Sequence, residues 1–167
     1  MKAIFVDVDG VICTERSLNI ALEKDQEIYN MEFDARTLKY LKKLMEKTGA
    51  ELVLSSSWRD GIGSDDPETK AVMDNLFGRM AENGTPLTYW TPLIYMGGRD
   101  DEVKAWLKDH PCEAYVIFDD NEYFKGSPEI ERHFVYIEDS QGIDLWDYLK
   151  ALRILGGHLP PPRTQDP

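Results

Sequence analysis

The chain has 167 residues, and 19 Lys and Arg against 31 Asp and Glu give a formal net charge of −12. This length suits one domain, and the acidic balance repels a polyanion unless basic side chains gather locally. No apolar stretch approaches the roughly 20 residues of a membrane helix, and Cys13 and Cys112 are too few and too distant for a disulfide framework. We therefore expect one cytoplasmic domain over 1–157 and a flexible Pro-rich tail over 158–167.

The first half of the chain predicts a strand, an excursion, a helix and a second strand. KAIFVDV at 2–8 is apolar and β-branched, which is typical of a buried strand, and the polar segment 12–33 is an excursion with a short hairpin or helical turn. Asp34 as N-cap and Gly49 as C′ residue bound an amphipathic helix. AELVLSS at 50–56 completes a βαβ unit, which favours a parallel sheet.

The second half continues the alternation of helices and strands. We expect a turn at 60–66, a helix from Pro67 to about Glu82, a structured loop with room for a short strand at 83–98, a helix at 100–109, strands at 114–120 and 133–138, and a helix over about 145–155. The predicted fold class is α/β, with a central, mostly parallel sheet and no second domain.

Polar side chains follow three of the predicted strands. Asp7 and Asp9 end the first strand, three serines at 55–57 end the second, and Asp119 and Asp120 end the third. Because the carboxyl ends of parallel strands meet at one edge of a sheet, we expect the four carboxylates to converge within a few ångströms.

Such a cluster of carboxylates is unstable without a counter-charge, because like charges repel one another. Oxygen ligands without a nearby His or Cys indicate Mg²⁺, which binds one or two carboxylates together with substrate phosphate. The alternative is that each aspartate only caps a helix or turn, which is less compatible with paired acids on two buried strands.

The motifs resemble those of the haloacid dehalogenase (HAD) superfamily. FVDVDGV at 5–11 resembles the first motif, LVLSSSWR at 52–59 the second, and RDDEVKAWLKDHPCEAYVIFDDNE at 99–122 the third and fourth. The combination is most similar to the HAD domains of Swiss Army Knife RNA-repair proteins, over about 2–156. The resemblance implies a three-layer, Rossmann-like phosphatase fold.

The resemblance also implies a role for each acid. Asp7 would attack phosphorus and form an aspartyl-phosphate, and Asp9 would act as general acid and then as general base. Mg²⁺ would lie between Asp7, the main-chain carbonyl of Asp9, and Asp119 or Asp120.

The same resemblance predicts groups that bind the phosphate. The second motif would supply one hydroxyl, from Ser55 or Ser56, and the sequence does not choose between them. The third motif would supply a cation, for which Arg99 is preferred and Lys104 is the alternative. Arg59 either reaches the substrate or forms a surface ion pair.

Several other residues have two interpretations. Trp58 and Trp90 could stack on a base or pack in the core, whereas core packing is favoured for Trp106. The three histidines are expected on the surface or in packing positions, and Cys13 lacks a local partner that would activate it.

The expected substrate is a phosphorylated nucleotide, a polynucleotide end or a small phosphomonoester, and the spacing of the motifs helps to choose among them. The intervals between motifs are too short for a large cap domain, so we expect an open site with at most a small flap from 12–33. An open site and the resemblance favour polynucleotide ends, whereas the net charge disfavours them. Alternatives are a non-catalytic phosphate- or metal-binding regulatory module, a receiver-like domain, and a phosphotransferase with the same residues.

Overall fold

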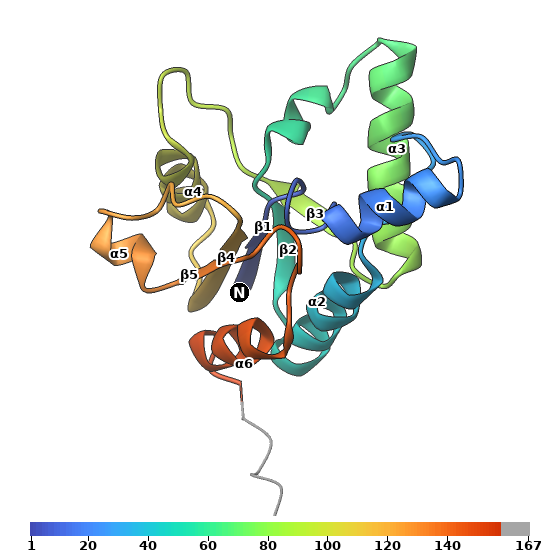
Figure 1. The fold of residues 1–167 in the computed structure, drawn as a ribbon. Coiled ribbons are helices and arrows are strands. Elements are labelled where there is room, and N and C mark those ends of the chain that lie inside the picture. Colours follow the sequence, from blue (N-terminus) through green and yellow to red (C-terminus); the bar gives the residue numbers. More distant parts are fainter. Residues whose placement is uncertain (158–167) are drawn as a thin grey trace, which may run out of the picture.

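The computed structural model describes residues 1–157 and contains a five-stranded parallel sheet in the order β3-β2-β1-β4-β5 (Figure 1). The strands are β1 (Lys2–Val6), β2 (Glu51–Leu54), β3 (Leu87–Trp90), β4 (Ala114–Asp119) and β5 (Phe134–Tyr136). The predicted α/β class with a parallel sheet is confirmed. The short strand expected within 83–98 is β3, which pairs with β2 at one edge of the sheet.

Helices cover both faces of the sheet, and this makes three layers (Figure 1). They are α1 (Glu15–Glu23), α2 (Ala35–Thr48), α3 (Pro67–Glu82), α4 (Arg99–Asp109), α5 (Pro128–Glu131) and α6 (Leu145–Ile154), with a 3₁₀ helix η1 (Ser57–Gly61). Side chains alternate along β1: Ile4 and Val6 pack with α2, α3 and α6, whereas Ala3 and Phe5 pack with α4 and α5. No cap domain is inserted between the described elements, as expected.

Local capping explains why α2 begins and ends where it was predicted. The Asp34 carboxylate accepts hydrogen bonds from the main-chain N–H groups of Arg36 and Thr37, each at 3.0 Å. At the other end Gly49 adopts a left-handed conformation, with φ 68°, which a glycine enters without steric cost. Both predicted boundaries are confirmed.

The excursion at 12–33 is more ordered than a hairpin or a single helical turn, because it contains the nine-residue helix α1. Thr14 is its N-cap, and the Thr14 and Ser17 side chains each bond to the other's main-chain N–H. The Thr14 hydroxyl also donates to Asp34 at 2.6 Å, which joins α1 to the start of α2. A Thr-x-x-Ser pair is a weaker helix signal than Thr-x-x-Glu, so this helix could not be predicted from its capping residues.

The remaining differences are small. Part of the turn expected at 60–66 belongs to η1, and the four-residue helix α5 was not predicted. None of the helices described within 1–157 combines the length and apolar character needed to cross a membrane. The tail predicted over 158–167 lies outside the described residues.

Candidate active site

Three carboxylates meet at the carboxyl edge of the sheet. Asp7 follows β1, Asp119 ends β4, and Asp120 comes next, because β1 and β4 are parallel neighbours with Val6 opposite Phe118. Asp7, Asp119 and Asp120 each offer an oxygen, and these oxygens all lie within 4.8 Å of one another. We call these three residues the acidic cluster.

Gly10 allows the turn after β1 to approach Asp120 closely. It has φ 73°, and a Cβ at this position would lie 2.3 Å from Oδ2 of Asp120. Both the backbone conformation and the space therefore require glycine. The turn after β1 thus presses directly against the acidic cluster.

Burial of the cluster disfavours its charge. Burial raises the pKa of Asp119 to about 7, and the neighbouring Asp7 carboxylate adds to the effect. Burial also raises the pKa of Asp7, against the opposing effects of a Ser56 hydrogen bond and the Arg99 charge. Oδ2 of Asp119 is buried without a partner among the described residues. An oxygen-only set with an orphaned, buried carboxylate oxygen fits a hard divalent cation.

Asp9 lies apart from the acidic cluster, so three of the four expected carboxylates converge rather than four. Its exposed side chain accepts a hydrogen bond from the indole Nε1 of Trp58, at 2.9 Å from Oδ2. Phe33 packs edge-on against Trp58 and holds the indole in place. The main-chain N–H groups of Val11, Ile12 and Cys13 all donate to the carbonyl of Val8, so Asp9 lies in a turn rather than on the strand. The predicted metal contact of Asp9 used its main-chain carbonyl and stays a prediction.

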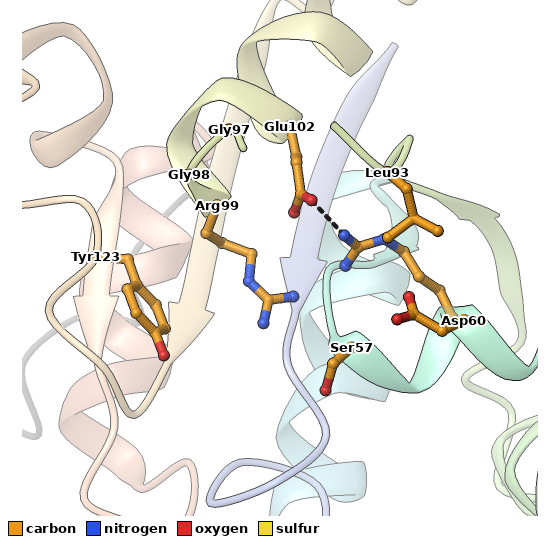
Figure 2. Close-up of a pocket in the computed structure, with 9 residues that line it drawn as sticks. Ser57, Asp60, Leu93, Gly97, Gly98, Arg99, Glu102 and Tyr123 are labelled. Carbon is orange, nitrogen blue, oxygen red and sulfur yellow. Dashed lines mark hydrogen bonds and ion pairs between the residues drawn. The ribbon is translucent and has the colours of Figure 1, made fainter. Parts of the chain in front are cut away.

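Arg99 occupies a hollow of about 310 Å³ beside the cluster, which we call the arginine hollow (Figure 2). It is the first residue of α4, and its guanidinium group extends between Tyr123 and Ser57 (Figure 2). Nη1 of Arg99 is buried without a partner among residues 1–157. Its charge opposes the effect of burial on the pKa of Asp119 as well as on that of Asp7. An anion held against Asp7 would therefore meet this guanidinium.

Lys104, the alternative cation, is engaged elsewhere. Its ammonium group donates to Asp100 at 3.0 Å and to Ser127 at 3.3 Å. These partners lie on its own helix and just before α5, so the ammonium group is already paired away from the candidate phosphate site.

Arg59 forms an ion pair, but this pair is buried rather than on the surface. Its guanidinium lies 2.5 Å from Glu102 of α4, shown by the dashed line in Figure 2, and also donates to the carbonyl of Ser56 at 2.6 Å. The pair joins η1 to α4 and so fixes two walls of the arginine hollow. The role of Glu102 could not be predicted from the sequence, since nothing local couples positions 43 residues apart.

The two serines of the second motif are in different environments. The Ser56 hydroxyl oxygen accepts a hydrogen bond from the main-chain N–H of Trp58 at 3.4 Å, and Ser56 opposes the effect of burial on the pKa of Asp7. The Ser55 hydroxyl is enclosed in the protein and has no partner among the described residues. Ser55 is fixed beside the first strand, because its main-chain N–H donates to the carbonyl of Val6 at 2.9 Å.

The remaining candidate residues separate clearly. Trp106 is buried among Phe5 and Tyr89, as expected for a core residue, whereas Trp90 is half exposed. His110 stacks on Trp106, and His133 stacks on Tyr115. Both histidines therefore have packing roles, and His158 lies outside the described residues.

Comparison with known protein families identifies a match. A family model described as the HAD domain in Swiss Army Knife RNA repair proteins matches residues 3–147. This range includes the acidic cluster, Asp9, both serines and Arg99. No curated protein matches the chain.

Proposed function

The chain belongs to the family of HAD domains in Swiss Army Knife RNA repair proteins, and we propose that it is a Mg²⁺-dependent phosphohydrolase that forms an aspartyl-phosphate on Asp7. The observation that carries the proposal is the acidic cluster with an arginine beside it. Three carboxylate oxygens lie within 4.8 Å of one another, and Arg99 has a buried N–H group without a partner in the described chain. Carboxylates for a cation beside a guanidinium for an anion suit a phosphate ester.

In the first step a carboxylate oxygen of Asp7 attacks phosphorus. The ester P–O bond breaks, its electrons pass to the leaving oxygen, and Asp9 gives that oxygen a proton. In the second step Asp9 takes a proton from water, and the water oxygen attacks phosphorus. The P–O bond to Asp7 then breaks, which releases inorganic phosphate and restores the Asp7 carboxylate.

The contact with Trp58 supports the role of Asp9. An indole N–H only donates, so Oδ2 of Asp9 must accept. When Asp9 is protonated, the proton therefore resides on Oδ1. Trp58 thus orients the carboxyl group and fixes which oxygen gives the proton to the leaving group.

The metal would be held by Asp7, Asp119 and Asp120, with the main-chain carbonyl of Asp9 as the further predicted ligand. When bound, Mg²⁺ would supply positive charge that offsets the charge of the nucleophile and of the phosphoryl oxygens. Arg99 would contact a phosphoryl oxygen, and Lys104 is less suitable because Asp100 already binds its ammonium group. Ser56 is the better candidate for the second-motif hydroxyl, since it lowers the pKa of the Asp7 carboxyl against the effect of burial.

The substrate is a phosphomonoester, and the family description makes phosphorylated polynucleotide ends or nucleotides the first class to assay. The net charge of −12 opposes long-range attraction of a polynucleotide. The other proposal from the sequence, a non-catalytic module that binds phosphate or metal, predicts binding without turnover. A cytoplasmic location stays a prediction.

Hydrolysis of para-nitrophenyl phosphate with and without Mg²⁺ tests the proposal. Asp7→Asn keeps the shape of the side chain but removes the charged nucleophile, so we expect turnover to fall by at least about 1,000-fold. Asp74→Asn is the matched control, since Asp74 is exposed on α3 and pairs with Lys70. Full activity in Asp7→Asn would refute the mechanism, and phosphate binding without turnover in the wild type would favour the non-catalytic module.

A further inference from the structure

A second hollow, of about 360 Å³, has the Asp9 carboxylate in its wall. We call it the apolar hollow. Its other walls come from α1, the segment after α1, and η1, and include Leu18, Leu22, Ile28, Met31 and Trp58. Its volume lies within the roughly 300–1,000 Å³ that is usual for small-molecule sites. Most of its lining residues belong to the segment 12–33, and none of the steps of the proposed phosphoryl transfer uses this segment.

The walls of the apolar hollow are anchored on both sides. At its N-terminus α1 is joined to α2 by the hydrogen bond from Thr14 to Asp34. After α1, the side-chain amide of Asn75 on α3 donates to the carbonyls of Ile28 and Met31, both at 3.1 Å. The hollow is therefore held open by the fold rather than by a loose loop.

The side chains of the apolar hollow select against anions. Its charged members are the carboxylates of Asp9 and Glu27, and no Lys or Arg lines it. Cys13 is neutral, because burial raises the pKa of its thiol to about 11. Leu18, Leu22 and Ile28 are large apolar side chains that stay partly exposed here, so an apolar ligand would cover them.

The position of Asp9 connects this hollow to the reaction. A general acid must contact the leaving oxygen, so the carbon skeleton attached to that oxygen begins beside Asp9. The arginine hollow contains the guanidinium that would bind the phosphoryl group. The apolar hollow is lined by Asp9, the proposed general acid, and by no Lys or Arg. The leaving group therefore extends from Asp9 into the apolar hollow.

We propose that the apolar hollow binds the leaving group and selects phosphomonoesters whose alcohol carries an uncharged aromatic group. This inference rests on the proposed function and assigns a substrate class to the same site. Trp58 has two roles in it: its N–H orients Asp9, and its ring forms part of the wall.

The test compares three alkyl phosphates with similar leaving oxygens: ethyl phosphate, 2-(1-naphthyl)ethyl phosphate and 2-carboxyethyl phosphate. We expect kcat/KM to be about 30-fold higher for the naphthyl ester than for the ethyl ester, because the ring covers apolar surface. The carboxyethyl ester should be the poorest of the three. Equal rates for the three esters, or faster hydrolysis of an oligonucleotide with a terminal phosphate, would overturn the proposal.

A matched pair of variants on α1 locates the effect. Leu22 lines the apolar hollow, whereas Ile20 is exposed on the same helix and does not line it. Leu22→Asp should lower kcat/KM for the naphthyl ester roughly tenfold more than for the ethyl ester. Ile20→Asp should change neither. Equal effects of the two substitutions would mean that the leaving group does not occupy this hollow.

Binding of the product alcohol separates this proposal from the proposed function. We would titrate 2-(1-naphthyl)ethanol into the full chain and follow the Trp58 indole N–H resonance, identified by its loss in Trp58→Phe. The expected result is a saturable shift that Leu22→Asp weakens and Ile20→Asp does not. If no ester is hydrolysed but this binding occurs, the phosphatase assignment fails and the apolar hollow stands. If the shift is absent or unaffected by Leu22→Asp, the apolar hollow is refuted whether or not the esters are hydrolysed.

Discussion

The arginine hollow and the apolar hollow flank the same chemistry but are built from different parts of the chain. The arginine hollow is lined by η1 and the start of α4, which the buried pair of Arg59 and Glu102 joins. The apolar hollow is lined largely by α1 and the segment after it. Phosphoryl recognition therefore belongs to the elements around the strand ends, whereas leaving-group recognition belongs to the segment inserted after β1. In such an arrangement the leaving-group preference can change without rebuilding the phosphate site.

Among changes to the two hollows and the turn beside them, the largest effect should follow a change in the arginine hollow. Arg99→Ala removes the guanidinium beside Asp7, and we expect kcat/KM to fall by about 100- to 1,000-fold for every phosphate ester. Lys104→Ala is the control and should have little effect, because Lys104 binds Asp100 and Ser127. Steady-state kinetics on both variants would show this. The reverse ranking would mean that the cation was assigned wrongly.

Gly10→Ala tests the close approach of the turn after β1 to Asp120. A Cβ would be 2.3 Å from Asp120, at φ 73°, so we expect a loss of about 2–4 kcal/mol in the free energy of unfolding. Activity should also fall strongly, since Asp120 must move. Gly49→Ala has a similar φ of 68° with no atom within 4 Å, and it should cost only about 1–2 kcal/mol and leave activity intact. Urea denaturation and turnover would be measured for both, and equal losses would argue against a tight contact at Gly10.

Trp58→Phe tests the link between Asp9 and the apolar hollow. The substitution keeps an aromatic wall but removes the N–H that orients Asp9, so we expect kcat to fall about tenfold, in the range of one lost hydrogen bond to a charged group. Trp90→Phe is the control, since Trp90 does not contact Asp9. An unchanged kcat in Trp58→Phe would remove Trp58 from the positioning of the acid.

The smallest effect concerns metal and pH at the acidic cluster. Asp119 binds its proton more tightly when folded, with a pKa of about 7 against 3.8 ordinarily, so its contribution to folding stability decreases as pH rises through this interval. Mg²⁺ should relieve that loss. We expect saturating Mg²⁺ to raise Tm by about 5 °C at about pH 8 and by much less at about pH 5, where protons compete. Thermal melts with Mg²⁺ or a chelator would check this, and an equal rise at both pH values would contradict it.

Much of the fold could be predicted because its signals are local. Asp34 and Gly49 mark the ends of α2 within a few residues of sequence, and the apolar runs of β1, β2 and β4 need no distant information. The meeting of Asp7 with Asp119 and Asp120 also followed from local reasoning, since parallel strands bring their ends together.

The features that could not be predicted depend on side-chain direction or distant contacts. Asp9 lies in the turn that follows Val8, and its side chain bonds to Trp58, 49 residues further along the chain. The pairing of Arg59 with Glu102 spans 43 residues. The contact of Lys104 with Ser127 spans 23 residues, whereas its pairing with Asp100 is an i,i+4 contact that helix periodicity allows. The apolar hollow forms only when α1 is in its folded position. The polar sequence of 12–33 gives little indication of that helix, so the hollow could not be predicted.

The most direct test of the central claim is to detect the phosphoryl group on Asp7. Asp9→Asn lacks the base for the second step, and para-nitrophenolate leaves with little help from an acid, so the intermediate should accumulate on acid quenching with Mg²⁺ present. We predict that mass spectrometry will find the peptide containing Asp7 heavier by one phosphoryl group, and that Asp7→Asn will abolish the signal. A phosphoryl group on another residue, or hydrolysis without any labelled peptide, would contradict the aspartyl-phosphate mechanism.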